Sequence, residues 1–392
     1  MISVEEARTL IAAHQRTLPA QPTSLSEAAG GYLLEDIHSD HDHPLFDMSA
    51  VDGYAFAFRT DVTDFKVVGE VAAGAFHPVA LAQGECIRIF TGAMVPEGAD
   101  TVVMQERTSR DGDRMAYVDP TLRHGSNVRK RGEQIRAGET VIRAGVRITP
   151  AVIGLLASIG KQHVHTARRP RIGVVITGSE FMESGALVTG RIFNSNDAML
   201  AALLQQEGAD VELHRAADES DALERTLDAL ARTCDLVVTT GGASVGDHDL
   251  LAPSLRKLGA PIVFHGIAQK PGKPMLFAML KDVPVFALPG NPRAVLICAW
   301  EYVIPYLRAM QGAQQPLLEQ DRLPLSHAVE VKGNRAEFRA ARVSEGRVRL
   351  LADEGSHMLR SFMEANAIVY LPEQQRRWET NATVEVHHLP AP

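Results

Sequence analysis

The chain has 392 residues, of which 45% are hydrophobic and 22% charged, and its formal net charge is −8 at pH 7. This composition is typical of a globular protein with several domains, and the negative charge argues against a general nucleic-acid binder. Three cysteines without a CxxC pair predict no disulfide framework, so a cytoplasmic location is expected. No signal peptide is expected, because the N-terminus lacks a basic start followed by an apolar core. No membrane span is expected, because no apolar run approaches ~18 residues.

The first part of the chain is expected to form two domains. An amphipathic pattern predicts a helix over Val4–Gln15, and a later helix is expected to begin at Pro150, since proline is favoured at the first helical position. Residues 46–134 instead show short β-rich runs separated by Gly and Pro. We therefore predict a discontinuous N-terminal domain, 1–45 and 135–168, interrupted by an inserted β domain.

Residues 169–314 alternate between strand and helix patterns. The runs RIGVVITG, DVELHRA, DLVVTTGG and VPVFALPG predict strands, and NPRAVLICAWEYVIPYLRAM predicts one helix. Another helix would be capped by Asn196 or Asp197 and closed by Gly208. Such alternation predicts a three-layer α/β domain with a mostly parallel sheet, followed by a C-terminal β domain over 315–392.

Ligands of open parallel sheets bind beyond the carboxyl ends of the strands, where this chain has the loops TGSE, GGASVGDHD and PGNP. Gly241 and Gly242 leave bare backbone that can approach an anion, and the next helix offers its positive N-terminus. Asp247 and Asp249 suit a hard cation such as Mg²⁺. The alternative is a tight turn in which Asp249 only caps the helix.

Further polar residues follow in the same region. Glu180 would project over the same edge of the sheet, and Asn196 could bond a ribose or base, although either could serve only as a helix cap. The run QKPGKP sets Lys270 and Lys273 around a Pro-Gly turn, which favours a compact oxyanion over a turn with solvated lysines. From the residues alone, we predict an α/β protein that binds a phosphorylated ligand with a divalent metal.

The motifs SAVDGYA, IFTGAMVPEGADTVVMQE, RGEQI, ITGSE, TTGGASVGDHD, KPGKP and LPGNP, in this order, resemble those of the molybdopterin molybdenumtransferase family, which is similar to the E domain of gephyrin. The resemblance covers essentially the whole chain. It implies four structural domains and an elongated homodimer. It also implies that molybdenum from molybdate is inserted into adenylylated molybdopterin, with Mg²⁺ assisting and AMP released.

The resemblance also implies roles for individual residues. Asp52 and Thr91 would be contributed by the partner subunit, and the two lysines, Ser244 and Ser356 would hold molybdate. The candidate catalytic residues are Asp52, Glu180, Asp218, Asp249, Lys270 and Lys273. The candidate pterin- and molybdate-binding residues are Thr91, Thr177, Gly178, Asn196, Gly241, Gly242, Ser244, Pro289 and Ser356, and the candidate metal ligands are Glu180, Asp247 and Asp249.

Three positions depart from the family pattern. Gly266 and Ala340 stand where relatives often have basic residues, and Gln134 replaces an acid. These changes are compatible with weaker anion capture, a shifted set of residues or a preference for tungstate. Two other functions stay open: the upstream molybdopterin adenylyltransferase, which resembles 169–314 alone, and a non-enzymatic scaffold like gephyrin. That adenylyltransferase and downstream molybdoenzymes are expected partners.

Overall fold

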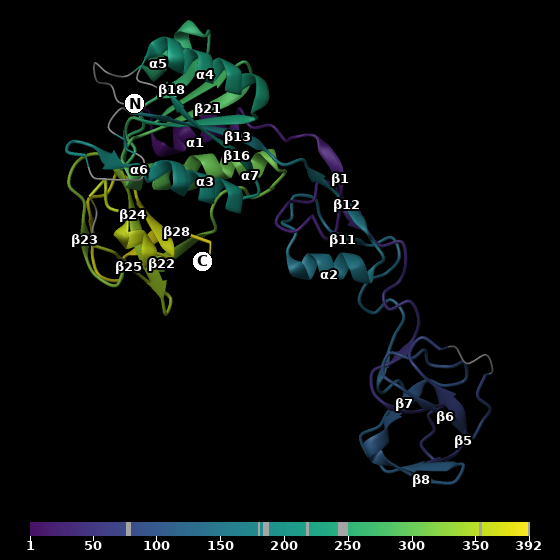
Figure 1. Ribbon diagram of the computed structural model, residues 1–392. Helices are drawn as coiled ribbons and strands as arrows, with labels where there is room; N and C mark the ends of the chain where they lie inside the picture. The colour runs from purple at the N-terminus through teal and green to yellow at the C-terminus, as the bar shows by residue number, and fades with distance from the viewer. Residues whose placement is uncertain are drawn as a thin grey trace. The chain divides into compact units, whose positions relative to one another are not determined.

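The computed structural model describes residues 1–75, 80–178, 181–182, 188–216, 219–241, 250–352 and 355–390. The chain divides into two compact units (Figure 1). The first comprises residues 1–34, 145–149 and 163–392, and the second comprises 35–144 and 150–162. Each unit has its own sheets and its own hydrophobic core. The domain boundaries expected from the sequence stay a prediction.

A six-stranded sheet forms the centre of the first unit. Its strands, in spatial order, are β16 (Asp210–Ala216), β13 (Arg171–Thr177), β17 (Leu236–Thr240), β21 (Val283–Leu288), β20 (Leu276–Leu280) and β18 (Ile262–His265). The first four run parallel, whereas β20 is antiparallel to both of its neighbours. The predicted mostly parallel sheet is therefore confirmed, and β18 and β20 extend it.

Helices cover both faces of this sheet (Figure 1). On one face lie α4 (Ser220–Thr233) and α5 (Leu251–Lys257); on the other lie α1 (Val4–Ala12), α3 (Asn196–Gln206), α6 (Pro292–Cys298) and α7 (Ile304–Met310). Neighbouring residues of β13 point to opposite faces: Val174 packs in one core cluster and Val175 in the other. A Cβ on Gly173 would lie 2.9 Å from Leu230 of α4, so glycine permits this close approach.

The helix predicted over 291–310 is interrupted. A π-helical turn, η2 (Ala299–Val303), separates α6 from α7, and the N–H of Ile304 donates to the carbonyl oxygen of Ala299. The cause is Pro305, which has no N–H and whose ring would clash with the carbonyl of Glu301 in a regular α-helix. The predicted helix is therefore present from Pro292 to Met310, with a π-helical turn in it that the sequence pattern did not predict.

The C-terminal part of the first unit is a β domain, as predicted. Its main sheet has the order β19 (Gln269–Lys270), β24 (Ala336–Ser344), β26 (Ala367–Leu371), β28 (Thr383–His388) and β22 (Gln320–Pro324), with β25 (Arg347–Leu350) also paired to β24. Strand β19 belongs to the chain between β18 and β20, so the α/β sheet and this sheet share one connection. Phe338, Ile368 and Tyr370 extend the core of the α/β layers.

Shorter elements complete the first unit. Strands β1 (Ala20–Ser24) and β12 (His163–Ala167) pair, as do β14 (Phe181–Met182) with β15 (Ile192–Phe193) and β23 (Val329–Glu330) with β27 (Arg377–Trp378). A single 3₁₀ turn, η3 (Arg360–Met363), precedes β26.

The second unit is built around another six-stranded sheet. Its order is β7 (Thr101–Met104), β4 (Gly53–Phe56), β6 (Glu85–Ile89), β5 (Asp64–Val71), β9 (Arg114–Tyr117) and β8 (Thr108–Asp111). It also contains η1 (Gln105–Arg107), the pairs β2 (Ile37–His38) with β11 (Thr140–Ile142) and β3 (Met48–Ser49) with β10 (Val128–Arg129), and α2 (Pro150–Ser158). The rings of Phe56 and Tyr117 stack 5.3 Å apart in its core, and α2 begins at Pro150 as predicted.

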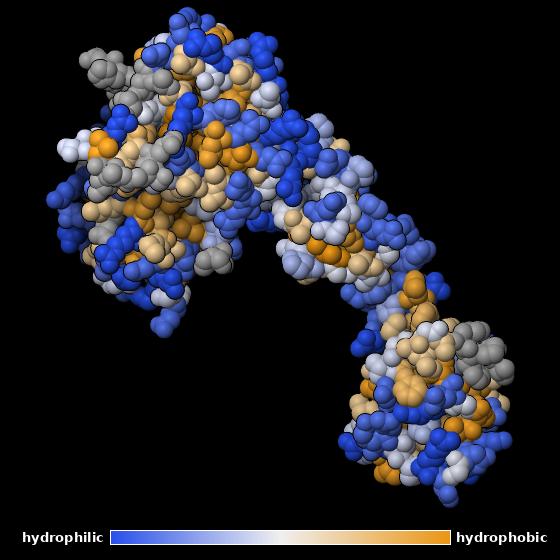
Figure 2. Space-filling model, viewed as in Figure 1, coloured by the Kyte–Doolittle hydropathy of each residue, from blue (hydrophilic) through white to orange (hydrophobic). Residues whose placement is uncertain are grey.

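The surface of each unit is mixed in character. On the face shown in Figure 2, hydrophilic side chains surround smaller hydrophobic areas. The longest described helix, α4, has 14 residues, whereas a transmembrane helix needs about 20. Within the described ranges, no helix is long and apolar enough to cross a membrane.

Candidate functional site

The carboxyl ends of β13, β17 and β21 meet at one edge of the α/β sheet, as the topology predicted. The hydroxyl of Thr177 donates to the carbonyl oxygen of Thr240 at 3.3 Å. Gly241 follows with φ of +83°, and a Cβ on it would lie 2.8 Å from two oxygens of Thr177. Gly178 also has a positive φ, +134°. Glycine is therefore required at 241 by conformation and by space, and it leaves backbone bare at this edge.

Asn196 lies at the same edge, at the start of α3. It is buried, and its side-chain N–H donates to the carbonyl oxygen of Gly290 at 2.8 Å, while its backbone N–H donates to Asn194. The sequence predicted Asn196 or Asp197 as the helix cap, but the cap is Ser195, because Asn196 already belongs to the first helical turn. Its side chain thus ties α3 to the loop after β21, and its Oδ1 finds no partner among the described residues.

Several candidate residues lie outside the described part of the chain: Glu180, Asp218, Gly242, Ser244, Asp247 and Asp249. Within the described ranges, no group of three or more His, Cys, Asp or Glu side chains could hold a metal ion. The acidic part of the candidate site and the metal ligands therefore stay predictions.

A pocket of about 440 Å³ lies beside the turn that carries the two lysines. We call it the lysine pocket, and its described lining is Lys270–Pro274, Pro289, Asn291, Arg293, Ala294, Arg335, Glu337, Phe338, Arg339, Gly355 and Ser356. It brings together four of the predicted residues, Lys270, Lys273, Pro289 and Ser356. Three arginines line it that had not been predicted as site residues.

The charges of the lysine pocket favour an anion. Two lysines and three arginines line it, against one carboxylate, that of Glu337, among the described residues. Glu337 is buried and accepts hydrogen bonds from Arg339 at 2.8 Å and Lys270 at 3.4 Å, so it sets the positions of two cations. The pairing of Lys270 with Glu337 in the β19–β24 ladder brings them together.

Arg293 borders the pocket from the first turn of α6. Its side chain is almost fully buried, its Nη1 donates to the hydroxyl of Ser361 at 2.8 Å, and its guanidinium lies 5.3 Å from the ring centre of Phe362. Its backbone N–H donates to the carbonyl oxygen of Ser356 at 3.1 Å. This bond places the segment with Ser356 at the start of α6.

The second unit brings Asp52 and Thr91 into contact. The backbone N–H and the hydroxyl of Thr91 donate to Asp52 Oδ1 at 2.8 and 2.7 Å. These two hydrogen bonds, with a smaller effect of Arg88, lower the pKa of the Asp52 carboxyl. Asp52 is partly exposed and its carboxylate stays ionised at neutral pH, so it can bind a cationic or hydrogen-bond-donating group.

Comparisons with known proteins cover nearly the whole chain. The models for the MoeA N-terminal region (domain I and II), a probable molybdopterin binding domain and the MoeA C-terminal region (domain IV) match residues 2–160, 173–309 and 322–389. The molybdopterin molybdenumtransferase of Bacillus subtilis (strain 168) is 32% identical over 98% of this chain and 93% of its own length. The chain belongs to the molybdopterin molybdenumtransferase family. The corresponding protein of Haemophilus influenzae is 31% identical over 98% of both chains.

A solved structure shares this fold. The molybdopterin biosynthesis MoeA protein of Pyrococcus horikoshii OT3 matches with a TM-score of 0.85 and 28% identity, over 99% of this chain and all of its own. The family resemblance and the predicted multidomain fold are thus confirmed. The matches to the N-terminal and C-terminal regions also argue against the adenylyltransferase alternative, which was expected to resemble residues 169–314 alone.

The structure shows the backbone conformation or burial of the three residues that depart from the pattern of the molybdopterin molybdenumtransferases. Gly266 has φ of +93°, a conformation that L side chains rarely adopt. Ala340 is fully buried, whereas Arg335 and Arg339 line the lysine pocket. Gln134 is exposed in the second unit. The two arginines agree with the interpretation that the basic residues of the pocket are shifted in this chain.

Proposed function

We propose that this chain transfers molybdenum from molybdate to adenylylated molybdopterin and releases AMP. The observation that carries the proposal is the lysine pocket, whose described lining includes five basic side chains and one carboxylate. Pro289 lines this pocket and directly follows β21, one of the strands whose ends form the glycine-bearing edge. This proximity supports a model in which an oxyanion binds in the lysine pocket and the phosphates of the substrate bind at the neighbouring strand ends.

The protein would act mainly by positioning and by charge compensation. Lys270 and Lys273 would hold the molybdate dianion, while the bare backbone at Gly178 and Gly241 would let the phosphates of the substrate approach the strand ends. Water then adds across the bond between the two phosphates of adenylylated molybdopterin, which yields AMP and leaves the second phosphate on the pterin. The two dithiolene sulfurs of the pterin replace two oxygens of molybdate, which leave as water. Fixed cations that meet developing negative charge are an effective source of rate enhancement, and no protein nucleophile is required.

A divalent cation such as Mg²⁺ is part of the proposal. Its support is that β16, β13 and β17 are adjacent parallel strands, and that Asp218, Glu180 and Asp247 follow their carboxyl ends in sequence. Glu180, Asp247 and Asp249 would hold the ion. When bound, it would neutralise negative charge on the phosphates of the substrate.

The reaction is tested by supplying adenylylated molybdopterin, molybdate and Mg²⁺ and measuring AMP and active cofactor. Lys270→Ala and Lys273→Ala should each raise the molybdate concentration for half-maximal AMP release by roughly 10- to 100-fold, because a lost charge-assisted hydrogen bond costs about 1.5–3 kcal/mol. Pterin binding should change much less. Lys332→Ala, an exposed lysine outside the pocket, is the control. No AMP from the unmodified protein would refute the proposed reaction.

Asp249 provides a separate test of the metal site. Asp249→Asn should still bind adenylylated molybdopterin and should release little AMP even with excess molybdate, because the amide removes the anionic metal ligand. Thermal stability should stay nearly unchanged, because Asn has nearly the same shape as Asp and α5 has its N-cap at Leu250, not at Asp249. Near-normal AMP release at ordinary Mg²⁺ would remove Asp249 from the mechanism.

We also propose that the chain acts in the cytoplasm as a homodimer in which Asp52 and Thr91 of one copy complete the site of the other. Sedimentation should show a dimer. Mixed dimers of Asp52→Asn and Lys273→Ala chains should regain activity, because one of their two sites then combines an intact Asp52 with an intact Lys273. A fully active monomer, or mixtures as inactive as either variant alone, would contradict the shared site.

A further inference from the structure

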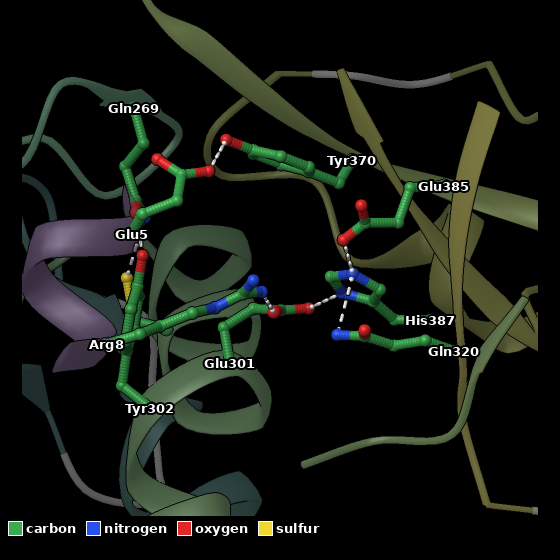
Figure 3. A network of polar contacts seen from close by, with 10 residues as sticks. Glu5, Arg8, Gln269, Glu301, Tyr302, Gln320, Tyr370, Glu385 and His387 are labelled. Atoms are coloured by element: carbon green, nitrogen blue, oxygen red, sulfur yellow. Dashed lines mark hydrogen bonds and ion pairs between the residues drawn. The ribbon is translucent and has the colours of Figure 1, made fainter. Parts of the chain in front are cut away.

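The lysine turn, Gln269–Pro274, rests on a buried side chain that the function above does not use. Gln269 is fully buried, and its side-chain N–H donates to the carbonyl oxygen of Pro271 at 2.9 Å. The same nitrogen lies 3.6 Å from Cys298 Sγ. The hydroxyl of Tyr302 donates to Gln269 Oε1 (Figure 3). Both polar atoms of this side chain are therefore engaged beneath the turn.

The backbone around Gln269 is held as well. Arg335 donates to its carbonyl oxygen at 3.1 Å, and its register partner in the β19–β24 ladder is Ala336. Gly272 has φ of +98°, and a Cβ there would lie 2.5 Å from Cys298 Sγ and from Gln269 Nε2. The turn is thus packed directly onto the Gln269 amide.

Tyr302 reaches Gln269 from the π-helical turn that Pro305 imposes. Cys298 ends α6 and Tyr302 lies within η2, and both are buried and contact the same amide. π-Helical turns occur frequently at functional sites. Here the irregular turn presents a hydroxyl to the residue directly before Lys270.

We propose that Gln269 and Tyr302 are positioning residues that fix the spacing of Lys270 and Lys273 for binding of a tetrahedral oxyanion. The Lys270 side chain is half exposed, and two ammonium groups on one short turn repel each other. Without the amide beneath it, the turn can relax into arrangements in which the two charges separate. Pre-organisation of this kind lowers the cost of binding, because the cations need not be ordered by the ligand. The inference rests on the proposed function of the lysine pocket.

Tyr302→Phe tests the inference, because it removes only the hydroxyl and keeps the ring. We expect the molybdate concentration for half-maximal AMP release to rise about threefold to tenfold, as for the loss of one buried hydrogen bond. Maximal AMP release at saturating molybdate and the affinity for adenylylated molybdopterin should change less than twofold. Titration with molybdate alone in a calorimeter should show the same loss of affinity.

Tyr306→Phe is the matched control. Tyr306 is fully buried in the adjoining α7, and its hydroxyl donates to the carbonyl oxygen of His14 at 2.6 Å, away from the turn. It should cost comparable stability and leave the molybdate dependence unchanged. Gln269→Met, which keeps the volume and removes all polar contacts of the side chain, should have a larger effect on molybdate than Tyr302→Phe.

The outcomes separate this inference from the function on which it rests. If Lys273→Ala weakens molybdate binding and Tyr302→Phe does not, the positioning role is refuted and the pocket stands. If Tyr302→Phe and Tyr306→Phe weaken it equally, the effect is general stability and the inference is again refuted. If neither lysine variant alters the molybdate dependence, the proposed role of the lysine pocket is refuted, and the positioning role of Gln269 and Tyr302 is refuted with it.

Discussion

A buried histidine should make the stability of the first unit depend on pH. His387 of β28 is fully buried; its Nδ1–H and Nε2–H each donate at 2.8 Å, to Glu301 and Glu385 respectively (Figure 3). Burial alone lowers the pKa of His387, but the charge of Glu301 and hydrogen bonds to both carboxylates outweigh it, and the pKa is raised to about 9. Arg8 of α1 donates to the other oxygen of Glu301 at 2.7 Å. The positive charges of Arg8 and His387 therefore balance the negative charges of Glu301 and Glu385.

The size of the effect follows from the two pKa values. The ordinary value is 6.5 and the folded value about 9, which corresponds to about 3 kcal/mol, since one pKa unit is worth about 1.4 kcal/mol. Because the folded pKa is the higher one, this stabilisation is fully present below pH 6.5. It is lost as the pH rises through 9, where the folded histidine gives up its proton.

The assay compares the unmodified chain with His387→Gln in urea at pH 6 and pH 10. Both tryptophans, Trp300 and Trp378, lie in the first unit, so their fluorescence follows its unfolding alone. The unmodified chain should be the more stable at pH 6, and the difference should shrink by about 3 kcal/mol at pH 10. Groups that titrate alike in both chains contribute equally to the two free energies of unfolding, so their contributions cancel in the difference. A difference that does not change with pH would refute the charged His387.

Three further predictions concern other contacts. Arg308→Met leaves the buried carboxylate of Glu207 without its cationic partner, which contacts it at 2.9 and 2.6 Å. The free energy of unfolding of the first unit should therefore fall by about 3–5 kcal/mol, and a loss under about 1 kcal/mol in the same fluorescence assay would contradict this. Gly272→Ala forces a side chain into a positive φ and should raise the half-maximal molybdate concentration at least about tenfold; an unchanged value would show that the turn tolerates it. Asp52→Asn keeps an acceptor for Thr91, so thermal scans should shift little while AMP release falls strongly; a parallel loss of both would indicate a structural role.

The α/β layers could be predicted because their signals are local. The apolar runs of β13, β17 and β21 and the amphipathic pattern of α4 each specify an element within a few residues. The exceptions have specific causes. Pro305 causes a π-helical turn where helix propensity alone predicts a regular α-helix. The side chain of Asn196 donates to a carbonyl oxygen of a loop far away in sequence and does not cap the helix.

The candidate site was only partly predictable. Lys270 and Lys273 lie on one turn, so their proximity followed from the sequence, whereas Ser356 was found only through the family resemblance. Arg335 and Arg339 were not assigned to the site, because the β19–β24 pairing that brings them to the lysines joins segments far apart in sequence. One signal was available: Arg335, Glu337 and Arg339 alternate, which places them on one face of an extended chain.

The sharing of β19 between the two parts of the first unit limits how this protein can be recombined. The segment that carries the lysines is at once a connection of the α/β sheet and the edge strand of the C-terminal sheet. A chimera that takes the C-terminal domain from a relative would therefore also replace the hydrogen-bonding partner of Lys270 and the arginine side of the pocket. The C-terminal domain is accordingly not an exchangeable module, and its boundary in sequence is not a boundary of the binding site.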